Sequence, residues 1–140
     1  HFIGDLEDNR IPDENKFLMN ETEQLTKNNK KLNLVFAFNY GSRKEIHDAY
    51  TKLNKNSIDQ LDEESFRANL LLPEMPDPDL LIRTAGEKRV SNFLLYQLSY
   101  TELMFVDTLW PDFDEKELDS AVDEFQNRVR KYGNAWRNIW

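Results

Sequence analysis

The sequence predicts an α/β fold with a mostly parallel sheet and flanking helices. Three apolar runs, "HFIGD", "LNLVFAFNYG" and "DLLIRTAG", each carry a glycine at or near their end. Few polar residues interrupt these runs, which is typical of strands buried on both faces of a sheet. Helical segments lie between them, and alternating strands and helices favour parallel pairing with right-handed crossovers. The chain of 140 residues has the length of one domain, and we expect a single domain over residues 1–140.

Apolar spacing and capping residues predict the helices. The predicted segments are residues 13–27, residues 43–54, a short helix after Asp62, a helix from Ser91 or Asn92 through "FLLYQLSY", and a last helix from Asp114 to Gly133. The second segment has the clearest pattern, because Ile46, Ala49, Tyr50 and Leu53 recur at helical spacing. The last segment carries its apolar side from Leu118 through Val122, Phe125 and Val129 to Tyr132.

The composition excludes several classes of protein. A net charge of −8 argues against a general affinity for nucleic acid, which requires a positive surface. The absence of cysteine excludes disulfides, thiolate zinc sites and cysteine nucleophiles. No apolar stretch is long enough to cross a membrane, and we expect a cytoplasmic protein. The chain starts with His1 close to a strand-like segment, so we expect it to be part of a longer protein.

Polar and basic residues follow the predicted strands, where open parallel sheets bind ligands. Arg83, Arg89 and Ser91 follow the third strand, whereas Asn39 and Arg43 follow the second. Arginine offers paired donors to phosphate oxygens, and the start of a helix adds positive potential. For a single arginine, pairing with a surface carboxylate is the favoured alternative. Two arginines and a serine in one loop favour an anion site.

The same residues resemble a known family. The segment "DLLIRTAGEKRVSNFLLYQLSYTELMFVDTLWPDFD" strongly resembles the C-terminal signature of the cis-prenyltransferases, the undecaprenyl diphosphate synthase family. "FNYGSRKEI" is similar to that family's NYGGRxEI stretch, and "FIGD" resembles the strand before it. The resemblance runs in order from Phe2 to about Gly133, and its long motif is specific.

The resemblance implies a cis-prenyltransferase-like fold that is incomplete at its N-terminus. It also implies an enzyme that joins isopentenyl diphosphate to an allylic diphosphate with Mg²⁺, making Z double bonds, with undecaprenyl diphosphate as the expected product. By position, Arg83, Arg89 and Ser91 would hold the diphosphate of isopentenyl diphosphate. Glu102, in "SYTELMF", would be a ligand of Mg²⁺. Without the resemblance, Glu102 is an ordinary solvated or hydrogen-bonded carboxylate.

Other parts of the family pattern match less closely. Asn39 and Arg43 match the NYGGR element as substrate-binding residues, but a strand-ending turn explains them at least as well. Ser42 stands in place of the element's second glycine. Near the C-terminus, 131–133 reads Lys-Tyr-Gly where the family often has Arg-x-Gly. The family also implies a homodimer, which we place at the aromatic C-terminal region, and contact with a membrane surface through the lipid product.

One essential motif has no counterpart. The family's catalytic aspartate, in MDGNxR, does not occur, so we expect it N-terminal to this chain and expect these residues alone to be inactive. Two alternatives stay open. One is a noncatalytic subunit or fragment that supports a catalytic partner, although such members tend to lose the arginine–serine loop that is present here. The other is a generic phosphate-binding α/β domain.

Overall fold

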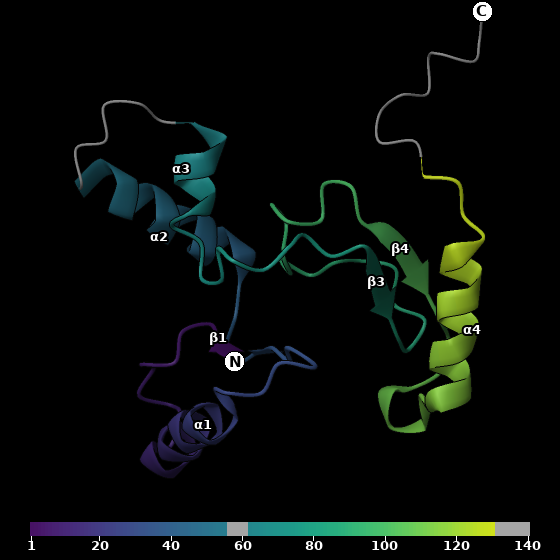
Figure 1. Cartoon of the computed structure of the whole chain (residues 1–140), viewed down its shortest axis with the longest axis horizontal. Coiled ribbons are helices and arrows are strands. Elements are labelled where there is room, and N and C mark those ends of the chain that lie inside the picture. Colours follow the sequence, from purple (N-terminus) through teal and green to yellow (C-terminus); the bar gives the residue numbers. More distant parts are fainter. Residues whose placement is uncertain (56–61, 131–140) are drawn as a thin grey trace, which may run out of the picture. The chain divides into compact units, whose positions relative to one another are not determined.

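The computed structural model of the chain describes residues 1–55 and 62–130. The chain divides into two compact units, His1–Pro76 and Asp77–Trp140 (Figure 1). Both contain a parallel strand pair and helices, which confirms the predicted α/β class. The prediction of a single domain over residues 1–140 stays a prediction. Neither described range contains a helix that is long and apolar enough to cross a membrane.

The first unit begins with the predicted strand–helix–strand order. Strand β1 (Phe2–Ile3) pairs in parallel with β2 (Phe36–Ala37), and helix α1 (Asp13–Thr26) lies between them in the sequence. The Phe2 and Phe36 rings stack with their centroids 5.4 Å apart. The strands are much shorter than the apolar runs that predicted them.

Two further helices complete this unit. Helix α2 (Ser42–Lys55) buries Ala49 and Leu53, as its apolar spacing predicted. Helix α3 (Glu63–Arg67) begins at the predicted cap, where the Asp62 carboxylate accepts a hydrogen bond from the Ser65 backbone N–H at 2.8 Å. Leu70 was predicted on this helix but lies beyond its end, where it is nevertheless buried.

The predicted burial of the second strand is wrong. Both residues of β2 are exposed, and the Phe36 side chain keeps 51% of its surface accessible. A pair of strands only two residues long offers too little surface for a helix to cover each face. Helix α1 likewise buries none of its residues, which agrees with its partial apolar stripe. The buried apolar side chains of this unit are Ile3, Ile11, Ala49, Leu53 and Leu70.

The second unit contains the longer strand pair. Strand β3 (Leu80–Arg83) runs parallel to β4 (Glu102–Phe105), with Leu80 opposite Glu102 and Arg83 opposite Phe105. Side chains alternate between the faces of a strand pair, so Arg83 and Glu102 belong to opposite faces as well as opposite ends. Helix α4 (Glu115–Gln126) lies alongside this pair (Figure 1). A short 3-10 helix, η1 (Trp110–Asp112), precedes α4.

Two helix predictions in this unit need correction. Residues 91–100 form turns and no helix. Ser91, Asn92 and Leu94 have φ angles of 49°, 62° and 46°, which a right-handed helix does not accommodate. Helix α4 begins after its predicted Asp114 cap but ends at Gln126, so Val129 is 82% exposed. The predicted stop at Gly133 lies outside the described residues.

Candidate functional site

The carboxyl end of β3 presents a cation. Arg83 is the last residue of the strand and is half-buried, and its carbonyl accepts a hydrogen bond from the Val106 backbone N–H at 2.9 Å. Within residues 1–55 and 62–130, no hydrogen bond or ion pair occupies the Arg83 guanidinium. A partly buried guanidinium without a partner attracts anions strongly, because few water molecules screen its charge.

The loop after Arg83 is fastened to the chain that follows β4. The Ala85 N–H donates to the Thr108 carbonyl, and the Gly86 N–H donates to the Val106 carbonyl, both at 2.9 Å. These bonds turn the chain sharply, with φ angles of 65° at Ala85 and 67° at Gly86. The start of the loop therefore has a defined position relative to the strand pair.

Arg89 and Ser91 lie on the exposed part of this loop. The Arg89 guanidinium forms an ion pair with the carboxylate of Glu87; the Arg89 side chain is exposed, whereas that of Glu87 is partly buried. Ser91 is exposed, and in the described part of the chain its hydroxyl makes no hydrogen bond. Arg83, Arg89 and Ser91 thus belong to one loop, as predicted. An anion that binds Arg89 must take the place of Glu87.

Glu102 does not share this environment. It begins β4 opposite Leu80, at the amino end of the pair and on the face opposite Arg83. Its Oε2 accepts a hydrogen bond from Arg128 Nη1 at 3.1 Å. Arg128 also donates to Glu124 Oε1 at 2.6 Å, and this bond, followed by the one to Glu102, raises the pKa of the guanidinium. The structure therefore does not bring Glu102 to the predicted anion loop within one chain.

The described residues offer little for a metal ion. Across residues 1–55 and 62–130, no group of three or more histidine, cysteine, aspartate or glutamate side chains is arranged to hold one. Glu102 has one carboxylate oxygen, Oε1, that accepts no hydrogen bond from this part of the chain. Proteins commonly hold Mg²⁺ through one or two carboxylates and leave the other positions to water and phosphate. Glu102 fits Mg²⁺ as a single ligand of this kind.

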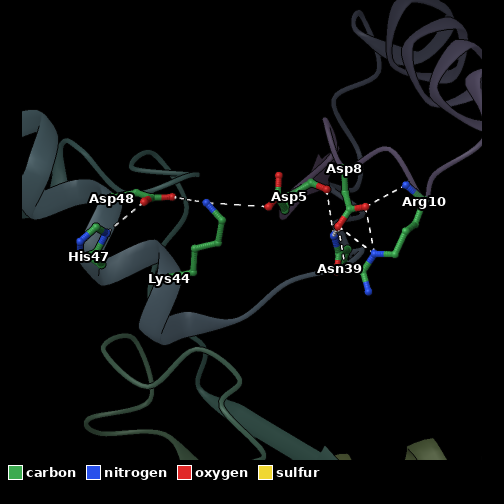
Figure 2. Close-up of polar contacts among 7 residues, drawn as sticks. All are labelled: Asp5, Asp8, Arg10, Asn39, Lys44, His47 and Asp48. Carbon is green, nitrogen blue, oxygen red and sulfur yellow. Dashed lines mark hydrogen bonds and ion pairs between the residues drawn. The ribbon is translucent and has the colours of Figure 1, made fainter.

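Asn39 lies beyond the carboxyl end of β2 and is already engaged (Figure 2). Its amide donates to the Asp5 carbonyl at 3.1 Å and to Asp8 Oδ2 at 3.2 Å. Arg10 donates to the same Asp8 carboxylate, with Nη2 at 2.6 Å from Oδ2, and thereby holds the pKa of Asp8 far below its usual range. Asn39 thus fastens the loop after β1 to the loop after β2.

Arg43 and its neighbours begin helix α2. Arg43 is exposed, whereas Ser42 is fully buried, so the residue that replaces the family's glycine fits the local packing. Lys44 Nζ lies 2.7 Å from Asp48 Oδ2 and 3.9 Å from Asp5 Oδ2 (Figure 2). The hydrogen bond from Lys44 lowers the pKa of Asp48. Lys44 and Asp48 are four residues apart on α2, so their ion pair supports the helix locally.

Sequence reasoning missed two groups of contacts. Glu45 is buried and accepts hydrogen bonds from the Tyr40 hydroxyl at 2.5 Å and from the Leu71 N–H at 3.0 Å. Arg128 joins Glu102 to α4, and only its spacing of four residues from Glu124 could have indicated an ion pair. Residues 131–133, predicted to replace the family's Arg-x-Gly, lie outside the described residues.

Comparison with known proteins decides the family. Residues 1–133 match the family model described as "Putative undecaprenyl diphosphate synthase". The chain belongs to the undecaprenyl diphosphate synthase family. The resemblance inferred from the sequence is therefore confirmed over nearly the whole chain.

Curated members of this family are similar along most of the chain. An isoprenyl transferase of Fusobacterium nucleatum is 48% identical over 127 residues, covering 91% of this chain and 55% of its own length. The ditrans,polycis-undecaprenyl-diphosphate synthase of Micrococcus luteus, described as specific for (2E,6E)-farnesyl diphosphate, is 45% identical over 137 residues, covering 94% and 54%. The chain thus spans about half the length of these relatives.

Solved structures of the family have the same fold. A "probable undecaprenyl diphosphate synthase" from Campylobacter jejuni superposes with a TM-score of 0.84 at 38% identity, over 95% of this chain and 62% of its own. Lavandulyl diphosphate synthase from Lavandula x intermedia, solved in complex with dimethylallyl diphosphate, gives 0.85 at 36% identity, over 92% and 57%. Both are therefore larger proteins that contain this fold.

Proposed function

We propose that the protein to which this chain belongs is a cis-prenyltransferase. It condenses isopentenyl diphosphate with an allylic diphosphate and yields a Z-polyprenyl diphosphate, with undecaprenyl diphosphate as the expected product. The observation that carries the proposal is the half-buried guanidinium of Arg83, which has no hydrogen-bond or ion-pair partner among the described residues, at the carboxyl end of a parallel strand pair in a member of this family. That position is where open α/β sheets bind ligands.

In this proposal, the loop after β3 is the isopentenyl diphosphate half-site. Arg83, Arg89 and Ser91 bind the diphosphate, and charge-assisted hydrogen bonds from guanidinium groups are well suited to its oxygens. The tether of Ala85 and Gly86 to the chain after β4 fixes the start of this loop before substrate arrives. Glu87 leaves Arg89 when the diphosphate binds. Because the Arg89 side chain is 62% exposed and that of Glu87 is 38% exposed, solvent screens the pair and this exchange costs little.

The proposal also contains the two residues of the NYGGR element. Asn39 and Arg43 are assigned to substrate as predictions carried over from the family pattern. The contacts of Asn39 with Asp5 and Asp8 favour a role in holding the loops, whereas Arg43 is exposed at the first turn of α2. Comparison of Asn39→Ala with Arg83→Ala separates a role in holding the loops from a role in binding the diphosphate.

Mg²⁺ and partner molecules complete the proposal. Mg²⁺, with Glu102 as one ligand, would neutralise part of the charge of a bound diphosphate, which within one chain would lie apart from Arg83, at the other end and on the other face of the β3–β4 pair. The family's catalytic aspartate motif has no counterpart in these 140 residues, so we expect this chain alone to bind but not to turn over substrate. A homodimer through the C-terminal region, a cytoplasmic location, membrane contact through the lipid product and the absence of a nucleic-acid partner remain predictions.

A calorimetric titration of the chain with isopentenyl diphosphate, with and without Mg²⁺, tests the half-site. We expect saturable binding that Arg89→Ala weakens roughly tenfold to a hundredfold, because a hydrogen bond to a charged group contributes about 1.5–3 kcal/mol. Lys116→Ala is the matched control, since it removes a cation from exposed α4 outside the loop.

Equal weakening by both variants would show only a response to net charge. Unchanged affinity in Arg89→Ala, with turnover of the complete protein also unchanged in Arg83→Ala and Arg89→Ala, would contradict the proposed function.

A further inference from the structure

Two arginines after α4 fasten its end to the amino end of the β3–β4 pair. Arg128 Nη1 donates to Glu102 Oε2 and to the Leu103 carbonyl, both at 3.1 Å, while its Nη2 donates to Glu124 Oε1 at 2.6 Å. The guanidinium therefore joins the first two residues of β4 to the last turn of α4. Its side chain is only 26% exposed, so water screens these bonds less than at an open surface.

Arg130 makes a comparable connection without touching Glu102. Its Nη1 donates to Asp79 Oδ1 at 2.5 Å, its Nη2 lies 3.4 Å from the Tyr100 carbonyl, and its guanidinium lies over the Phe125 ring. Asp79 is the residue immediately before β3. The two arginines thus hold the same helix to the same end of the strand pair through different carboxylates.

The carboxylate of Glu102 is held by one oxygen only. Oε2 accepts from Arg128, whereas Oε1 accepts no hydrogen bond from the residues that the structure describes. The side chain is 30% exposed, so Oε1 can be reached from solvent. Hydrogen bonds of this kind commonly orient the carboxylates that bind metals.

The net charge of the Glu102–Arg128–Glu124 network is negative and therefore favours a cation. Glu102 and Glu124 carry two negative charges, and Arg128 carries one positive charge, so one negative charge remains. Glu124 therefore offsets the repulsion that Arg128 alone would exert on a cation at Glu102. The arrangement orients the ligand while it keeps a net attraction.

We propose that Arg128 is a positioning residue for Glu102. It fixes the carboxylate through Oε2 so that Oε1 is presented to a divalent cation. The inference rests on the proposed function, in which Glu102 contacts Mg²⁺. It assigns to Arg128, which follows the C-terminal end of α4, the role of orienting that ligand.

Mn²⁺ is a suitable probe of this contact. The electron paramagnetic resonance signal of free Mn²⁺ gives the concentration of unbound ion, so binding is measured without turnover. The full chain is titrated with Mn²⁺ in the presence of inorganic pyrophosphate, and Glu102→Gln defines the background. We expect Arg128→Met to weaken Mn²⁺ binding about tenfold or more, the usual effect of losing a group that orients a metal ligand. Arg128→Lys should also weaken it, because an ammonium group does not reproduce the forked contact with Glu102 and Leu103.

Arg130→Met is the matched control. It should lower the thermal unfolding temperature as Arg128→Met does, because each variant removes one connection of α4, but it should leave Mn²⁺ affinity unchanged. A purely structural role of Arg128 predicts instead that the two variants change affinity equally.

Unchanged or tighter Mn²⁺ binding in Arg128→Met would overturn the inference, as would a wild-type chain whose binding does not depend on Glu102. In either case, loss of isopentenyl diphosphate binding in Arg89→Ala would leave the proposed function standing, so the two failures are distinguishable.

Discussion

The carboxyl ends of the two parallel strand pairs carry charged loops with opposite arrangements. Beyond β1 and β2, Arg10 lies 2.6 Å from Asp8, and Lys44 lies 2.7 Å from Asp48 (Figure 2). Beyond β3, the guanidinium of Arg83 has no hydrogen-bond or ion-pair partner in the described residues. The loops after β1 and β2, together with the start of α2, form the first loop cluster, in which Asp8 and Asp48 neutralise Arg10 and Lys44. The loop after β3 instead retains the Arg83 cation for an external anion.

This difference separates structural from binding charges. Asn39, Asp8 and Arg10 hold two loops together, so an anion at Arg10 would have to break an existing network. An anion that binds Arg83 breaks no contact among the described residues, and one that binds Arg89 breaks only its partly exposed ion pair with Glu87. Residue types alone do not distinguish the two loops, because both contain arginine, acidic residues and a glycine at the strand's end.

The largest expected contrast concerns the glycines of the two loops. Gly4 has φ +128°, and a Cβ there would lie 1.9 Å from the Phe38 backbone oxygen. Gly86 has φ +67°, and its Cβ would lie 3.2 Å from the Asp107 side chain. We expect Gly4→Ala to destabilise the protein by about 3 kcal/mol or more, because backbone must move. Gly86→Ala should cost about 1 kcal/mol, since an alanine can adopt the left-handed conformation.

Urea unfolding of the two variants, monitored by circular dichroism, measures this contrast. Equal losses would mean that the close approach of Gly4 to Phe38 does not hold the first loop cluster together.

Much of the fold follows from local patterns in the sequence. Helices α1 and α2 appear where apolar spacing placed them, and Asp62 and Asp114 cap helices as predicted. Capping depends on neighbouring residues only, so one sequence is enough to detect it. The helix predicted after Ser91 is absent although the composition of the segment is apolar and helix-compatible, because Ser91, Asn92 and Leu94 adopt left-handed φ angles that helix propensity does not indicate.

The candidate site was predictable as a set of residues but less so as an arrangement. Arg83 lies at a strand's carboxyl end because the preceding apolar run is a strand, and Arg89 and Ser91 follow in the same loop. The place of Glu102 depends on strand register, which pairs it with Leu80 and separates it from Arg83. Register and the contact with Arg128 arise from tertiary packing, which local patterns do not encode.

A second contrast compares Arg83→Ala with Asn39→Ala. Arg83→Ala removes a cation that has no partner in the part of the chain that the structure describes, so we expect it to preserve stability and to weaken isopentenyl diphosphate binding roughly tenfold to a hundredfold. Asn39→Ala removes hydrogen bonds to Asp5 and Asp8, so it should cost about 1–2 kcal/mol of stability and change binding little. Calorimetry and urea unfolding of both variants give the two readouts. Weak binding by a stable Asn39→Ala variant would instead support the family-based assignment of Asn39 to substrate.

The smallest expected effect is the pH dependence of the Asp8–Arg10 pair. The Arg10 hydrogen bonds lower the pKa of Asp8 in the folded protein, so the pair contributes stability above the ordinary aspartate pKa of about 3.9. That contribution declines as pH falls below this value toward the lowered pKa of the folded state. The difference in urea midpoint between wild type and Arg10→Ala should therefore be larger at pH 6 than at pH 3.

Lys27→Ala is the control, because Lys27 contacts the neutral amide of Gln24 and should give a difference independent of pH. An Arg10→Ala difference that is constant over this range would show that the cations of the first loop cluster are not neutralised by Asp8, and the contrast with Arg83 would lose its physical basis.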